Sequence, residues 1–110
     1  GPNRISNKGS MYGIKANMVT SIEPGYYKEN AYGIRIENLV YSKPSKKYEN
    51  FLEFEILTLV PIDKKLIDVY LLDAGEQDWL NNYHRKVYES LAACVNDVEK
   101  KWLKESCSPL

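Results

Sequence analysis

The residues in this chain that are best suited to chemistry lie in the stretch Ser21–Val40, which reads SIEPGYYKENAYGIRIENLV. Its two halves have the composition of β-strands, and the polar residues 28–31 between them are typical of a turn. In a hairpin centred on Asn30, Glu23 falls opposite Glu37. Two carboxylates that face each other across a strand pair repel, unless a cation lies between them. The stretch therefore predicts part of a binding site for a metal ion.

Three neighbours share the face of the two glutamates in this register. Side chains alternate between the faces of a strand, so Gly25 and Tyr27 fall beside Glu23. Arg35 falls beside Glu37 by the same rule. Carboxylates are hard oxygen ligands, which favour ions such as Mn, Mg or Ca. Two such ions about 3.5–4 Å apart could share a bridging hydroxide and promote hydrolysis.

The same residues also fit an ordinary amphipathic strand. Ile34, Ile36 and Val40 form an apolar face, so Arg35 and Glu37 on the other face could simply contact water. Periodicity and composition leave both interpretations open.

The order of several short motifs resembles a known family. EPGYY followed by YGIRIENLV looks like the metal-ligand hairpin of Xaa-Pro aminopeptidase (aminopeptidase P), a dinuclear metallopeptidase with the pita-bread fold. The match is closest to the cytosolic eukaryotic type. FLEFEILTLVPIDKKLIDVYLL and DWLNNYH resemble that family's C-terminal strand and helix. The resemblance covers residues 1 to about 102.

The resemblance implies specific roles for the hairpin residues. Glu23 and Glu37 would supply two of the five protein ligands of a dimanganese centre, with Glu37 bridging both ions. Glu23 would bind one ion and also act as a catalytic group that carries a proton to the leaving amine. Tyr27 and Arg35 stand where the family has groups that support the ligands or face the substrate. The implied reaction is hydrolysis of the N-terminal Xaa-Pro bond, with peptides that carry proline second as substrates.

The remaining ligands of that family, two aspartates and a histidine, are expected on other segments. The paired-aspartate motif is absent among the aspartates of this chain, which include Asp63, Asp68, Asp73 and Asp78. The single histidine, His84, has Leu80 and Tyr88 four positions away on either side. A capping or interfacial role is therefore expected for it rather than a ligand role. Because an incomplete ligand set positions metals poorly, the chain alone is expected to be inactive and to bind Mn weakly.

Other patterns predict the elements around the hairpin. A buried strand is expected at residues 18–22 and a basic polar loop at residues 41–50. Residues 51–62 alternate in polarity, which predicts one long strand or two short strands with a bulge. Glu53 and Glu55 within it repeat the spaced-carboxylate pattern, but they lie in a strand whose other face is apolar and are not expected to bind metal.

The periodicity becomes helical near the C-terminal end. Asp73, followed three residues later by Glu76, fits a capping-box variant. Apolar residues then recur every three or four positions, which predicts a helix at about 74–92 that continues or restarts to about 105. The stripe comprises Trp79, Tyr83, Val87, Leu91, Cys94, Val98 and Trp102.

Together these patterns predict an α+β fold in one domain. Antiparallel strands are followed by a long C-terminal helix, as in the C-terminal portion of a pita-bread fold. The expected divisions are a loop at 1–16, strands and loops at 17–72, and a helical tail at 73–106. The resemblance implies two partners, namely the remainder of the catalytic domain and a second copy in a homodimer.

Composition limits the other classes of function. The 110 residues contain 15 Lys plus Arg and 15 Asp plus Glu, so charge gives no reason to propose nucleic acid or a membrane as partner. No apolar run approaches the roughly 20 residues that span a bilayer. Cys94 and Cys107 are expected to be free thiols, and the protein is expected to be cytoplasmic. The GxGxxG, P-loop, CxxC, HExxH and GxSxG motifs are absent.

Three functional classes are consistent with these features. The chain could be part of an aminopeptidase catalytic domain. It could instead be a relative that lost catalysis and serves as a binding module. The third class is a dimerisation element that associates through the helix bearing Trp79 and Trp102.

Overall fold

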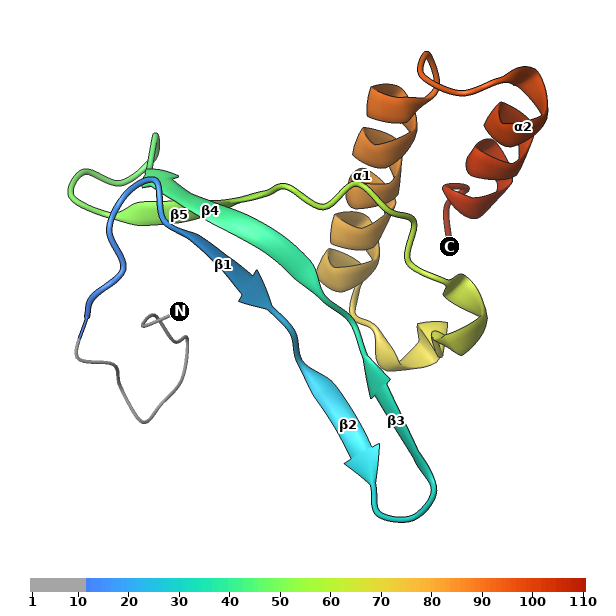
Figure 1. The fold of residues 1–110 in the computed structure, drawn as a ribbon, viewed down its shortest axis with the longest axis horizontal. Helices are drawn as coiled ribbons and strands as arrows, with labels where there is room; N and C mark the ends of the chain where they lie inside the picture. The colour runs from blue at the N-terminus through green and yellow to red at the C-terminus, as the bar shows by residue number, and fades with distance from the viewer. Residues whose placement is uncertain (1–11) are drawn as a thin grey trace. The chain divides into compact units, whose positions relative to one another are not determined.

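The computed structural model describes residues 12–110, which belong to two compact units (Figure 1). The first unit is Gly1–Thr58 and contains the described strands; the second is Leu59–Leu110 and contains the described helices. Most of the predicted loop at 1–16 lies outside the described residues.

The first unit is built on antiparallel strands. β4 (Asn38–Pro44) is the central strand of a three-stranded sheet, between β1 (Val19–Ile22) and β5 (Leu52–Ile56). β2 (Gly25–Lys28) and β3 (Tyr32–Arg35) form a separate two-stranded ladder.

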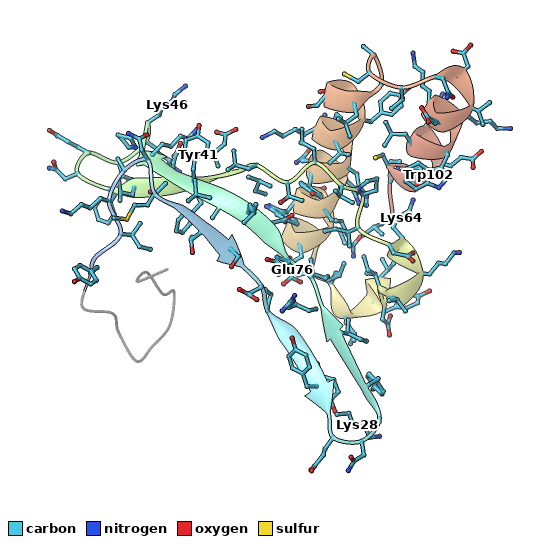
Figure 2. The ribbon with its side chains drawn as sticks, in the orientation of Figure 1. Lys28, Tyr41, Lys46, Lys64, Glu76 and Trp102 are labelled. Atoms are coloured by element: carbon cyan, nitrogen blue, oxygen red, sulfur yellow. The ribbon has the colours of Figure 1, made fainter. Side chains whose placement is uncertain are left out.

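The β1–β4 and β2–β3 ladders are two parts of one long hairpin. Gly25 pairs with Arg35 in one ladder and Ile22 pairs with Asn38 in the other, so both follow the same register. At the tip, which Figure 2 marks with Lys28, Asn30 adopts a left-handed conformation with φ 54°. Asparagine tolerates this conformation better than most residues, so it suits the centre of the turn. The predicted register is confirmed.

Two predictions in the first unit need correction. The loop expected at 41–50 begins later, because β4 continues to Pro44, which pairs with Leu52. Proline is tolerated there because it ends the strand, where a missing N–H costs little. The strand expected at 18–22 forms, but it is not buried in this chain: Val19 and Ile22 are 56% and 39% exposed.

The prediction of one long strand, or of two short strands with a bulge, at residues 51–62 is wrong beyond Ile56, where the only strand of this segment ends. The Leu57 N–H still donates to the carbonyl oxygen of Leu39 in β4 at 2.8 Å, but the strand ends at Ile56. Farther along, backbone groups of Val60 and Ile62 bind side chains of the helix that follows. The Tyr83 hydroxyl donates to the carbonyl oxygen of Val60 at 2.9 Å, and the Ile62 N–H donates to Nε2 of His84 at 3.1 Å. These side chains replace the neighbouring strand that the alternating pattern had suggested.

Two α-helices follow in the second unit. α1 (Ala74–Leu91) begins with the predicted capping box, in which the Glu76 N–H donates to Oδ1 of Asp73 at 2.8 Å. α2 (Asp97–Ser106) begins with a second capping box, formed by Asn96 and Glu99. The helical tail therefore restarts after Leu91 instead of forming one continuous helix, which was one of the two alternatives that the sequence left open.

The core of the second unit lies between the helices and the segment that precedes them. Its buried side chains are Leu80, Tyr83, His84, Val87, Leu103 and Cys107. Only part of the predicted apolar stripe is buried, since Trp79, Val98 and Trp102 are 50%, 81% and 60% exposed.

Two short 3-10 helices connect that segment to α1. They are η1 (Lys64–Leu66) and η2 (Val69–Leu71), capped by Asp63 and Asp68. Lys64 ties η1 to the end of α2, because its Nζ donates to the carbonyl oxygen of Ser108 at 2.8 Å. Figure 2 labels this lysine. Among the described helices none has the length and apolar character needed to cross a membrane.

Candidate metal centre

The two candidate ligands lie at the junction between the two ladders of the hairpin. Glu23 directly follows β1, and Glu37 directly precedes β4, so the common register places them opposite each other. Regular pairing is interrupted here because Pro24 has no N–H to donate. The backbone is joined at this point by the Ile36 N–H, which donates to the carbonyl oxygen of Pro24 at 3.3 Å.

Arg35 lies between the two carboxylates. Its Nη1 is 3.2 Å from Oε2 of Glu23, and its Nη2 is 3.3 Å from Oε2 of Glu37. The forked guanidinium thus binds one oxygen of each glutamate and offsets their mutual repulsion. The predicted need for a cation between the glutamates is met, within this chain, by a side chain of the hairpin itself.

Ser21 makes a further contact that the sequence interpretation missed. Its hydroxyl donates to Oε1 of Glu23 at 2.6 Å, so both oxygens of this carboxylate have partners. Ser21 precedes Glu23 by two positions, and strand residues at this spacing share a face. That spacing of a hydroxyl and a carboxylate was the signal available in the sequence.

Tyr27 lies on the same face and covers two glycines. A Cβ added to Gly25 would lie 2.9 Å from the Tyr27 hydroxyl oxygen, and one added to Gly33 would lie 2.7 Å from its Cδ1. The space opened by Gly25 is therefore filled by a tyrosine ring. Within residues 12–110, Tyr27 makes no hydrogen bond to Glu23 or Glu37, so it shares their face without joining their ion-pair network.

The described residues hold only part of a ligand set. No group of three or more His, Cys, Asp or Glu side chains gathers anywhere in residues 12–110. The pair Glu23 and Glu37 offers carboxylate oxygens, a donor type that suits Mn, Mg or Ca ions. The residues therefore fit a contribution to a metal centre, and further ligands would have to come from other segments.

The second carboxylate pair, Glu53 and Glu55, is bound differently. Both contact the ammonium group of Lys43 on the neighbouring strand, at 3.4 and 2.5 Å. The hydrogen bond to Glu55 is the main reason that the pKa of Lys43 is raised. This pair is part of an ion-pair network with Lys43.

His84 has a structural role in the second unit. It is fully buried, and its Nε2 accepts the Ile62 N–H. Burial is the main reason that the pKa of His84 is lowered, and the charge of Lys64 lowers it further. Its Nδ1 has no hydrogen-bond partner among the described residues. A neutral histidine that supports the 59–63 segment fits the interfacial role predicted for it.

Both cysteines are free. Cys94 is exposed and Cys107 is buried. Burial raises the pKa of the Cys107 thiol, so this group behaves as a small core side chain.

Comparison with known families identifies the class of this protein. Residues 50–110 match the family described as the C-terminal region of peptidase_M24, and residues 1–44 match metallopeptidase family M24. The chain belongs to metallopeptidase family M24. The resemblance noted in the hairpin and helix motifs is confirmed, and so is the α+β class, with two C-terminal helices.

Several relatives share about two fifths of their residues with this chain. Aminopeptidase P2 of Arabidopsis thaliana is 40% identical over 117 residues, which covers 100% of this chain and 16% of the relative. Xaa-Pro aminopeptidase app-1 of Caenorhabditis elegans is 43% identical over 104 residues, covering 88% of this chain and 17% of the relative.

A solved structure shows the same architecture. It is a crystal structure of X-prolyl aminopeptidase from Caenorhabditis elegans, described as a cytosolic enzyme with a di-nuclear active site. The TM-score is 0.86 at 40% identity, with coverage of 100% of this chain and 19% of that chain. The chain thus spans less than a fifth of the length of these relatives.

Proposed function

We propose that this chain is part of a dinuclear metalloaminopeptidase that hydrolyses the N-terminal Xaa-Pro bond of peptides. The observation that carries the proposal is the position of Glu23 and Glu37, which face each other and share the guanidinium of Arg35. The similarity to enzymes named as Xaa-Pro aminopeptidases supports the reaction and the substrate class.

Each hairpin residue has a distinct role in this proposal. Glu23 and Glu37 would hold the divalent metal ions, with Glu37 shared between the two ions, and Glu23 would also transfer a proton to the leaving amine. When bound, the ions, Mn²⁺ in this proposal, activate water and stabilise the charge that develops during hydrolysis. Arg35 orients the two carboxylates, and Tyr27 borders the space in which the peptide lies.

The chain needs partners to perform this reaction. Two glutamates cannot complete a dinuclear site, so the remainder of the catalytic domain supplies the other ligands and the substrate contacts. The isolated chain is therefore inactive in this proposal. A homodimer is proposed for the complete protein. A cytoplasmic location is supported by the cytosolic C. elegans relative and by the two free thiols.

Substitution of the glutamates in the complete protein tests the proposal. Glu23→Gln and Glu37→Gln keep the size of the side chain but weaken it as a metal ligand. Mutating a group that only contacts a metal ligand already changes metal affinity or activity by about 10–100-fold. Because each of these variants alters a proposed ligand itself, it should lower Mn²⁺ affinity and Xaa-Pro cleavage by at least about 100-fold. Glu53→Gln is the matched control, because this carboxylate binds Lys43 instead, and both properties should remain unchanged.

Two results would contradict the proposal. Full activity in both hairpin variants would show that Glu23 and Glu37 are not metal ligands. Metal-replete wild-type protein that binds Xaa-Pro peptides without cleaving them would instead indicate the alternative, a non-catalytic binding module. The exposed Trp102 of α2 favours a role in association for that alternative.

A further inference from the structure

The hydroxyl of Ser21 contacts one of the two proposed ligands and has no role in the function proposed above. It donates to Oε1 of Glu23 at 2.6 Å. Ser21 lies within β1, where it pairs with Leu39 of β4. The hydroxyl is therefore held by a regular ladder, whereas the glutamate lies just beyond the end of that ladder.

Glu23 needs such an anchor because backbone pairing is interrupted beside it. Pro24 lacks an N–H, and regular pairing resumes only at Gly25. A glutamate side chain has several rotatable bonds, and fixing it in one orientation costs conformational entropy. A hydrogen bond to a rigid neighbour restricts that freedom. A hydroxyl that donates to a carboxylate forms a charge-assisted bond, about twice as strong as one between neutral groups.

The contact also distinguishes the two glutamates. Arg35 binds Oε2 of Glu23 and Oε2 of Glu37, so any change of the arginine disturbs both ligands. Ser21 binds Oε1 of Glu23 alone. Loss of the hydroxyl therefore changes the orientation of a single ligand and leaves the arginine bridge in place.

We propose that Ser21 is a positioning residue of the metal site, whose hydroxyl fixes the plane of the Glu23 carboxylate. Ser21 touches neither the metal nor the substrate in this proposal, which rests on the function proposed above. Removing a group that is hydrogen-bonded to a metal ligand changes metal affinity or activity by about 10–100-fold. Because Glu23 keeps its contact with Arg35, the lower end of that range, about tenfold, is expected.

A pair of variants that differ only in the hydroxyl tests this role. Ser21→Thr and Ser21→Val have the same branched shape, and both suit a β-strand. In the complete protein, Ser21→Val should weaken Mn²⁺ binding to the metal-free form, measured by calorimetry, by about tenfold. It should also lower kcat at saturating metal while KM changes by less than about twofold, because the ligand and not the substrate contact is altered.

Ser21→Thr should restore wild-type metal affinity and kcat within about twofold, because the hydroxyl is retained. Thr20→Val is the matched control. It removes a hydroxyl from the adjacent residue of β1, whose side chain lies on the opposite face, and it should change neither property.

Two results would overturn the proposal. One is a Ser21→Val variant whose Mn²⁺ affinity and kcat equal those of Ser21→Thr. The other is an equal loss in both variants together with a lower melting temperature, which would limit Ser21 to strand packing.

Glu23→Gln separates this inference from the proposed function. If Glu23→Gln abolishes metal binding while Ser21→Val has no effect, only the positioning role fails; if Glu23→Gln also has no effect, the metal site itself fails.

Discussion

The ring of Tyr27 lies so close to Gly33 that a Cβ atom on this glycine would be 2.7 Å from the tyrosine Cδ1. The two residues are paired across the β2–β3 ladder. Gly25 lies under the same ring, since its Cβ would be 2.9 Å from Cε2. Two glycines thus allow one tyrosine to lie along the face that carries the candidate ligands.

Replacing Gly33 with alanine should displace that ring without unfolding the hairpin. Tyr27 is 67% exposed and can rotate away from a new methyl group, so the cost to stability should be below about 1 kcal/mol. The kcat/KM for an Xaa-Pro peptide in the complete protein should fall to the level of Tyr27→Ala. Gly13→Ala is the matched control, because a Cβ there meets nothing within 4 Å.

The double variant of Gly33 and Tyr27 provides the decisive comparison. If the alanine at position 33 acts by displacing the ring, it should have no further effect once Tyr27 is alanine. Additive losses would show that Gly33 acts in another way.

Removing the Arg35 guanidinium should leave two carboxylates facing each other without a compensating charge. Arg35→Ala is expected to lower the free energy of unfolding of the metal-free chain by about 0–1 kcal/mol, because all three side chains are more than two fifths exposed. Arg35→Lys should recover only part of the loss, since an ammonium group cannot bind both carboxylates with a fork.

Urea unfolding at low and high salt measures this effect. The difference between wild type and Arg35→Ala should shrink as salt increases, because exposed charges are screened. A difference that does not depend on salt would mean that the arginine stabilises the hairpin through packing of its aliphatic chain instead of its charge.

The sequence was sufficient to predict the hairpin because its register is symmetrical about Asn30. A slip of one residue would turn every side chain to the other face, so placing the turn also places Glu23, Arg35 and Glu37 together. The start of α1 was equally predictable, since Asp73 and the glutamate three positions later satisfy backbone groups locally.

The features that could not be predicted depend on partners distant in the sequence. Residues after Ile56 alternate like a strand, but Tyr83 and His84 bind their backbone groups from α1. The apolar stripe also gave no sign of where the helices separate. Asn96 and Glu99 carried that information as a capping box, which the stripe obscured. The sequence showed that Arg35 shares a face with the glutamates, but not that it would bind both.

The Asn96 cap predicts a measurable effect on α2. Its side chain accepts the Glu99 N–H at 2.9 Å, and the Glu99 carboxylate accepts the Asn96 N–H at 3.0 Å. Asn96→Ala should therefore lower the free energy of unfolding by about 1 kcal/mol. Asn96→Ser should retain most of the stability that the cap contributes, because serine also caps helices well. Lys100 is an exposed residue of the same helix, so Lys100→Ala serves as a control. It should change the free energy of unfolding by about 0.5 kcal/mol or less.

The buried His84 predicts loss of stability in mild acid. Its pKa is lowered in the folded chain, mainly by burial and further by the charge of Lys64, so the unfolded chain binds a proton more readily. Protonation would also remove the lone pair that accepts the Ile62 N–H. As the pH falls below the ordinary histidine value of 6.5, the free energy of unfolding should decrease, and it should level off below the folded pKa.

Comparison with His84→Gln isolates this contribution from that of other groups. A glutamine side chain can accept the Ile62 N–H through its amide oxygen, but it does not titrate. The free energy of unfolding can be measured by urea unfolding, followed by tryptophan fluorescence. Between pH 7.5 and 5.5 the wild type should lose more stability than His84→Gln. The difference in free energy of unfolding between the two proteins should change by at most about 1.4 kcal/mol per pH unit. Above about pH 8 the difference between the two proteins should be nearly constant, because His84 is then almost entirely neutral in both the folded and the unfolded chain. Parallel curves down to pH 5.5 would show that the folded chain accommodates the imidazolium, and that Nδ1 finds a partner when it is charged.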